Sequence, residues 1–159
     1  MLTLHSPAFL EGGIIPTRHT GRGEDLSPPF TAKGIPEGSV SLSILLEDTS
    51  HPLFRDFPHW LIWNLPVAEH IPEGIAPGGA VEVLGCTASQ GTAYGPRRYA
   101  GPKPPRWRRH LYRFTLLALD CRLELPPSTG KRRFLEMAEE HILERATLSG
   151  WFPRTGKSR

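Results

Sequence analysis

Two histidines stand at positions in the sequence where binding or catalytic groups are often found. His59 and His110 each begin an apolar segment, directly after a proline-rich or an arginine-rich loop, and strand ends beside long loops commonly carry functional residues. Asp48 ends another apolar segment. A carboxylate beside two imidazoles can bind a ligand or exchange protons with one. The structural alternatives are histidines that bond a backbone carbonyl and an aspartate that caps a turn.

A long irregular stretch from Gly91 to Arg109 supplies a second group of candidates, centred on Tyr99-Ala100-Gly101-Pro102-Lys103-Pro104-Pro105. Long loops of this kind in compact domains are usually functional. Gly101 lets a ligand approach the backbone closely, and its N–H can donate to an anion. The flanking prolines stiffen the loop and so lower the entropy cost of binding. The glycine order and the absence of a following helix exclude a dinucleotide-binding loop.

Positive charge is concentrated around this loop, although the whole chain has a net charge of only +3. Between Val83 and Leu119 there is no acidic residue, whereas seven cations occur: Arg97, Arg98, Lys103, Arg106, Arg108, Arg109 and Arg113. Such a stretch produces a local positive field. It predicts either a basic rim that attracts an anionic ligand or a solvated loop balanced by acids from elsewhere in the fold.

Several other kinds of site are excluded by the sequence. None of the seven histidines shows the spacing of an HExxH or HxH metal site, and Cys86 and Cys121 form neither a disulfide framework nor a zinc motif. We expect both cysteines to be reduced packing residues. A GxSxG motif, a Cys-His signature and a Walker loop are also missing. The sequence therefore predicts no metal and no cofactor.

The length of 159 residues suits one domain, and the 16 glycines and 17 prolines argue against a helical bundle. Apolar periodicity predicts strands over 2–9, 40–47, 59–65 and 110–120, with a short strand near Val81. It predicts one helix over 131–149, with Ser128 or Thr129 as its cap and Gly150 after its end. The pattern is typical of a β-sandwich or Greek key. Without an apolar membrane span or a signal-like start, we expect a cytoplasmic protein.

Six ordered motifs over most of the chain resemble the phosphatidylethanolamine-binding protein family, in its bacterial and archaeal branch, also described as Raf-kinase-inhibitor-like. An opening stretch reads Ile15 to Thr20 and then Asp25-Leu26-Ser27-Pro28-Pro29. The other matches follow in chain order. The segment from Asp48 to Pro52 matches D-P-D-A-P, that from His59 to Pro66 matches H-W-x-x-x-N-[IL]-P, and that from Tyr99 to Pro105 matches Y-x-G-P-x-P-P. The segment from His110 to Phe114 matches H-R-Y-x-F, and that from His141 to Trp151 matches H-I-L-x-x-A-x-L-x-G-[YW].

The resemblance implies a mostly β fold: a Greek-key β-sandwich with a large central antiparallel sheet, a smaller second sheet and one main C-terminal helix. It implies one domain over residues 1–154, followed by a basic tail over 155–159. The family pocket corresponds to the set Asp48, His59, Gly101, Pro102, His110 and Tyr112. The rim is expected to carry Arg98, Arg106, Arg108 and Arg109.

Two of the departures from the family pattern matter for the pocket. Ser50 replaces the second acid of D-P-D-A-P, which removes one negative charge from the pocket wall, and Leu111 replaces the arginine of H-R-Y. Because strand side chains alternate, Leu111 is expected to point away from a pocket that His110 and Tyr112 face. The family often has a cis peptide at the position of Pro52, and we expect one here.

By function, the resemblance implies a non-enzymatic protein that binds a small phosphorylated ligand or head group and regulates a kinase or protease partner. Bacterial relatives are often homodimers. Two alternatives follow from the residues themselves. One is a hydrolase that uses Asp48, His59 and His110 as acid–base groups. The other is a single-stranded nucleic-acid binder that uses the arginine-rich loop and its aromatic residues.

Overall fold

The computed structural model describes residues 1–94, 96–105 and 108–153, and it shows two β-sheets and one α-helix. The predicted tail over 155–159 lies outside the described residues. The smaller sheet has three short antiparallel strands in the order β1-β3-β6, with bounds β1 Thr3–His5, β3 Phe30–Lys33 and β6 His70–Ile71. A 3-10 helix, Thr17–His19, lies between β2 and β3 in the chain.

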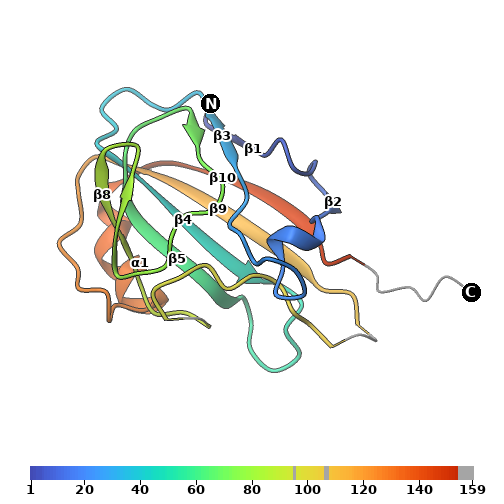
Figure 1. The fold of residues 1–159 in the computed structure, drawn as a ribbon. Helices are drawn as coiled ribbons and strands as arrows, with labels where there is room; N and C mark the ends of the chain where they lie inside the picture. Colours follow the sequence, from blue (N-terminus) through green and yellow to red (C-terminus); the bar gives the residue numbers. More distant parts are fainter. Residues whose placement is uncertain (95, 106–107, 154–159) are drawn as a thin grey trace, which may run out of the picture.

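The larger sheet has seven strands in the order β2-β10-β9-β4-β5-β8-β7. Its long central strands are β4 Ser41–Asp48, β5 Phe57–Leu65, β9 Leu111–Leu119 and β10 Ile142–Trp151, which run side by side in Figure 1. The outer strands are β2 Gly13–Ile14, β7 Ala80–Val83 and β8 Cys86–Gln90. All neighbours pair antiparallel except β2 and β10, which are parallel. The large sheet is therefore mixed, whereas we had expected it to be antiparallel.

Both faces of the large sheet are covered at its centre, which explains why β5 and β9 are largely apolar on both sides. One face packs against the small sheet through a cluster that includes Leu4, Phe30, Ile44 and Phe114. The other face packs against α1 Lys131–Ala138, where Phe134 lies near Trp63 with ring centroids 5.9 Å apart. The mostly β architecture with two sheets is confirmed.

The predicted helix over 131–149 is correct only in its first half. α1 ends at Ala138, a 3-10 turn follows over Glu139–His141, and the rest of the segment is strand β10. β10 pairs with β9 from Ile142↔Leu119 to Trp151↔Leu111, with one irregularity near its start. The edge of β9 needs this partner because its N–H and C=O groups would otherwise be unpaired. Long-range pairing thus overrides a local pattern that also fits a helix.

Two details of that prediction fail with it. The residue that caps α1 is Gly130, and neither predicted hydroxyl bonds the helix start. Gly150 lies inside β10 instead of ending a helix. A Cβ there would lie only 2.7 Å from the side chain of Ile15 and 2.9 Å from that of Phe9, so close packing is what Gly150 permits.

Candidate functional site

Three neighbouring strands of the large sheet, together with the loops beyond their ends, enclose a cavity of about 240 Å³. Asp48 ends β4, His59 lies near the start of β5, and His110 immediately precedes β9, which contributes Tyr112. The described residues that line it are Asp48, His51, Pro52, Phe57, His59, Tyr94, Lys103, Pro104, Pro105, His110 and Tyr112. Four of the six residues predicted for the ligand-binding pocket therefore line one cavity.

A buried carboxylate–imidazole pair forms the deepest polar contact of the cavity. Nδ1 of His110 lies 2.7 Å from Oδ2 of Asp48, and their side chains are 4 % and 3 % exposed. The other carboxylate oxygen accepts the Ser50 N–H at 2.8 Å. Because Asp48 holds Nδ1, the ring presents Nε2 to other partners. This Nε2 atom is buried and has no hydrogen-bond partner among the described residues.

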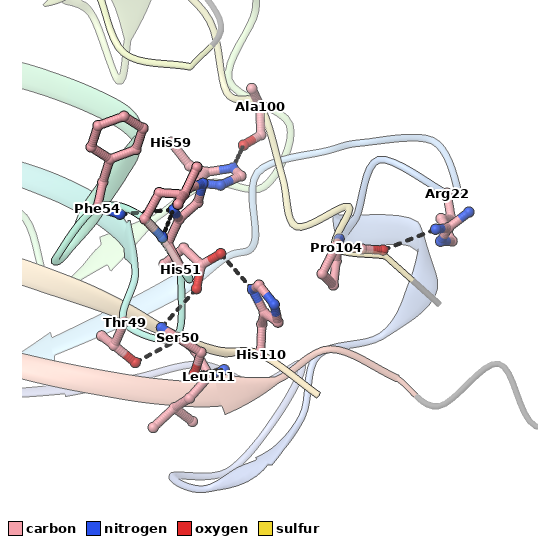
Figure 2. A network of polar contacts seen from close by, with 12 residues as sticks. Arg22, Thr49, Ser50, His51, Phe54, His59, Ala100, Pro104, His110 and Leu111 are labelled. Atoms are coloured by element: carbon pink, nitrogen blue, oxygen red, sulfur yellow. Dashed lines mark hydrogen bonds and ion pairs between the residues drawn. The ribbon is translucent and has the colours of Figure 1, made fainter. Parts of the chain in front are cut away.

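The second histidine is held by a backbone carbonyl. Nδ1 of His59 lies 3.0 Å from the carbonyl oxygen of Ala100, as Figure 2 shows. A carbonyl only accepts, so Nδ1 carries the proton and donates. Burial lowers the pKa of His59 below its ordinary value, against smaller opposing effects from its hydrogen bond to Ala100 and from the charge of Asp48. His59 is thus neutral at pH 7, and its Nε2 is a hydrogen-bond acceptor.

The wall between the two histidines is aromatic. The Tyr112 ring packs edge-on against His59 at 5.4 Å and stacks on His110 at 6.3 Å. Phe57 and Tyr94 extend the wall, and Tyr94 stacks on His59 at 5.1 Å. Burial first, and then the charge of Asp48 and a hydrogen bond to it, raise the pKa of the Tyr112 phenol. The phenol therefore stays neutral.

Gly101 and Pro102 do not line the cavity, although both are buried. The Gly101 N–H, which we had predicted to be available for an anion, donates instead to Oδ1 of Asp25 at 2.8 Å. Burial raises the pKa of Asp25, and this hydrogen bond and the charge of Arg98 act in the opposite direction. The Gly101 segment therefore positions the Ala100 carbonyl that holds His59.

The proline-rich wall is tied to a distant part of the chain. The Arg22 guanidinium donates to the carbonyl oxygen of Pro104 at 3.0 Å, a contact visible in Figure 2. On the opposite side, Nδ1 of His51 accepts the N–H groups of Leu53 and Phe54 at 3.2 and 3.1 Å. The His51–Pro52 bond in this turn is trans, so the cis peptide expected from the resemblance is wrong.

The predicted rim arginines have different environments. Arg98 lies 3.8 Å from Asp25, and Arg109 stacks on the ring of Trp151 at 4.6 Å. Arg108 is exposed, and Arg106 lies outside the described residues. Among the lysines and arginines of the described residues, Lys103 lines the cavity itself.

Sequence reasoning missed the other lining residues, chiefly His51, Phe57, Tyr94 and Lys103. Phe57 could have been predicted from the sequence, because a residue two positions before His59 on the same strand faces the same side. Lys103 lies inside a motif that had already been noted. Nothing in the sequence pattern singles out Tyr94, which the fold brings to the cavity from the irregular stretch.

No helix in the described part of the chain has the length and apolarity needed to cross a bilayer.

Residues 5–153 match the model of the phosphatidylethanolamine-binding protein family, so the chain belongs to that family. A UPF0098 protein of Pyrococcus abyssi is 36% identical over 94% of this chain and 84% of its own length. A UPF0098 protein of Methanothermobacter thermautotrophicus is 35% identical over 96% of this chain and 99% of its own length. A Mycobacterium tuberculosis relative that carries the name lipoprotein LppC is 30% identical over 95% of this chain and 72% of its own length.

Solved structures agree with this assignment. The crystal structure of a phosphatidylethanolamine-binding protein homologue from Chlamydia trachomatis is 30% identical and has a TM-score of 0.82, covering 96% of this chain and 97% of its own. The crystal structure of Escherichia coli YbcL has a TM-score of 0.85, covering 95% of this chain and 97% of its own, at 23% identity. This likeness supports the shared fold. The bacterial and archaeal relatives fit the branch that the motifs indicate.

Proposed function

We propose that this protein binds a small phosphorylated ligand or head group in the cavity between His59 and His110. The observation that carries the proposal is the buried Nε2 of His110, which has no partner in the described part of the chain. A buried polar atom without a partner is costly, and a bound ligand would relieve that cost. When the ring is protonated, Nε2–H becomes a charge-assisted donor, and the Asp48 contact at Nδ1 is retained.

The two histidines offer complementary chemistry to a phosphate group. His110 can donate to an unprotonated phosphate oxygen, whereas neutral His59 can accept from a P–OH group or from an amine on the ligand. Lys103 adds a positive charge to the wall. A monoprotonated phosphate, which has both kinds of oxygen, matches this arrangement better than a fully deprotonated anion does.

The cavity's size and wall suit the organic part of such a ligand. At about 240 Å³ it is smaller than a typical drug-sized site. Phe57, Tyr94 and Tyr112 give it an aromatic surface that packs against a short organic group or a cation. The described lining contains no serine, threonine or cysteine to act as a nucleophile. This composition favours binding over hydrolysis, so the function that we propose is not enzymatic.

The same proposal extends to the protein's setting, as the family resemblance implied. We propose that the ligand-bound protein regulates a kinase or protease partner, that it works in the cytoplasm, and that it forms a homodimer. Light scattering on the purified chain tests the dimer, because a monomeric mass at micromolar concentration would contradict it. Fractionation of cells tests the location independently of ligand binding.

Calorimetric titration with inorganic phosphate and with phosphorylethanolamine tests the ligand proposal. We expect one site per chain. His110→Ala should weaken binding by roughly 1.5–3 kcal/mol, or about 10- to 100-fold, through loss of a charge-assisted bond. Arg98→Ala should weaken it less, and mainly at low salt.

His70→Ala is the matched control, because His70 is an exposed histidine on β6 away from the cavity lining. Circular dichroism shows whether each variant keeps the wild-type fold. Equal phosphate affinities for wild type and a folded His110→Ala would contradict the proposal. Binding of short oligonucleotides that weakens steeply with salt, without phosphate saturation, would favour the nucleic-acid alternative instead.

A further inference from the structure

A second cluster of reactive side chains lies at the opposite end of β9 from the cavity. Asp120 and Cys121 directly follow β9, and His141 directly precedes β10. The two strands are antiparallel neighbours (Figure 1), so the end of one meets the start of the other. Nine residues of strand span roughly 30 Å. One donor atom from each of the three side chains lies within 4.8 Å of one from each of the others.

The backbone around this cluster is fixed by hydrogen bonds. The Asp120 N–H donates to the carbonyl oxygen of His141 at 3.0 Å. The buried Ser41 hydroxyl donates to the carbonyl oxygen of Cys121 at 2.6 Å. Nδ1 of His141 contacts Oδ1 of Asp120 at 2.8 Å. The three residues are therefore held together by the fold, whereas the half-exposed Asp120 and His141 side chains can still reorient.

We propose that Asp120, Cys121 and His141 form a binding site for a divalent transition-metal ion of the zinc type. One sulfur, one imidazole nitrogen and one carboxylate oxygen are a ligand combination that zinc accepts. A thiolate and a carboxylate together neutralise the charge of a divalent ion. Calcium and magnesium fit less well, because both prefer oxygen ligands throughout.

The spacing agrees with a tetrahedral ion. Zinc bonds of about 2.0–2.3 Å place neighbouring ligand atoms roughly 3.3–3.8 Å apart. The 2.8 Å Asp120–His141 contact is shorter than this range, and all three donor atoms lie within 4.8 Å of one another, so a small adjustment of the side chains lets them share one ion. The ion would take the place of the proton now shared by Asp120 and His141. Three protein ligands leave the fourth position to water.

Metal binding at this site should release protons. Burial and the nearby charge of Asp120 raise the pKa of the Cys121 thiol, so the free thiol is protonated at neutral pH. Zinc binds the thiolate and must displace that proton. Affinity is therefore expected to rise between pH 6 and pH 8, and proton release is measurable by titrating in buffers of different ionisation enthalpy.

Cobalt and zinc titrations test the proposal on the intact, reduced chain. Co²⁺ should give a tetrahedral visible spectrum with a thiolate-to-cobalt charge-transfer band, saturating at one ion per chain and displaced by Zn²⁺. Cys121→Ser should abolish the charge-transfer band, and His141→Gln should weaken zinc binding by at least tenfold. Cys86→Ser is the matched control, because it removes the other free, partly exposed cysteine.

Several outcomes would overturn the inference. They are a chain that binds no Co²⁺ or Zn²⁺ at stoichiometric concentration, a charge-transfer band that survives in Cys121→Ser, and a band lost equally in Cys86→Ser. Any of these would leave Asp120 and His141 as an ion pair that joins β9 to β10. The readout involves no residue of the cavity, so it stands or falls separately from the phosphate proposal.

Discussion

Leu111 donates its backbone N–H to the hydroxyl of Ser50 over 3.0 Å, which joins the start of β9 to the loop after β4. These are the two residues whose departures from the family motifs we singled out in the sequence. Thr49 strengthens the junction, because its N–H and hydroxyl both donate to the Leu111 carbonyl, at 2.9 and 2.8 Å. Asp48 and His110 directly flank this junction. The two departures thus form a local contact that positions the carboxylate–imidazole pair.

Ser50→Ala should therefore loosen the cavity as well as the fold. The Leu111 N–H loses its acceptor, and we expect a loss of about 1–2 kcal/mol in the free energy of unfolding. Phosphate affinity should fall with it, because His110 immediately precedes β9 and is displaced when the start of that strand shifts. Urea unfolding and phosphate calorimetry measure the two effects. Ser39→Ala is the comparison, since its hydroxyl bonds only the Pro36 carbonyl in a turn and should leave phosphate affinity unchanged.

Stability should depend on pH through His59. Its pKa is lowered by burial, so the unfolded chain takes up a proton near pH 6.5 and the folded chain does so only at lower pH. The stabilising contribution is complete above pH 6.5 and is lost as the pH falls. Urea unfolding at pH 7.5 and pH 5.5 should show a smaller difference for His59→Gln than for wild type. An unchanged difference would show that His59 titrates alike in both states.

A side chain at position 101 should disturb His59 indirectly. A Cβ on Gly101 would overlap the carboxylate of Asp25 and lie 2.6 Å from the carbonyl oxygen of His19. The segment must shift, and with it the Ala100 carbonyl that accepts from His59. We expect Gly101→Ala to cost about 1–3 kcal/mol. Gly130→Ala, where the nearest atom is 3.6 Å away, should cost clearly less in the same thermal or urea unfolding experiment.

Asn64 is predicted to matter for stability rather than for binding. It has a φ of 60°, and its amide group exchanges two 2.8 Å hydrogen bonds with the backbone of Leu123. Asn64→Ala should lower the free energy of unfolding by about 2–4 kcal/mol, with phosphate affinity unchanged. Asn64→Gly accepts the same φ but lacks both bonds. If the glycine variant were as stable as wild type, the hydrogen bonds would not carry the effect.

The sequence predicted the central strands well because their signal is local. Segments 59–65 and 110–120 are apolar on both faces, and they became β5 and β9 nearly as predicted. Segment 40–47 alternates instead, with most of its apolar side chains on one face, and it became β4. Placing Asp48, His59, His110 and Tyr112 at one cavity depended on the family motifs, since spacing alone does not show which strands are neighbours. Gly101 shows the limit of carrying family positions over to this chain, because its N–H already donates to Asp25 and is not available to a ligand.

The remaining errors have a common physical origin in long-range contacts. Ile142 and Ala146 fit a helical period, yet the free edge of β9 recruits this segment as β10. Similarly, Asp120 and Cys121 lie far from His141 in the sequence, and only the pairing of β9 with β10 brings them together. Metal motifs are recognised by short fixed spacings, so a cluster assembled from two strands escapes that search.

The placement of the Asp48–His110 pair also has a consequence for how the chain acquires its cavity. The two residues are 62 positions apart and meet only when β4 and β9 pair. A loop of that length must close before the pair can form, and structures dominated by distant contacts fold slowly. Recovery of phosphate binding during refolding should therefore coincide with formation of the central sheet, so that the ligand reports on completion of the fold.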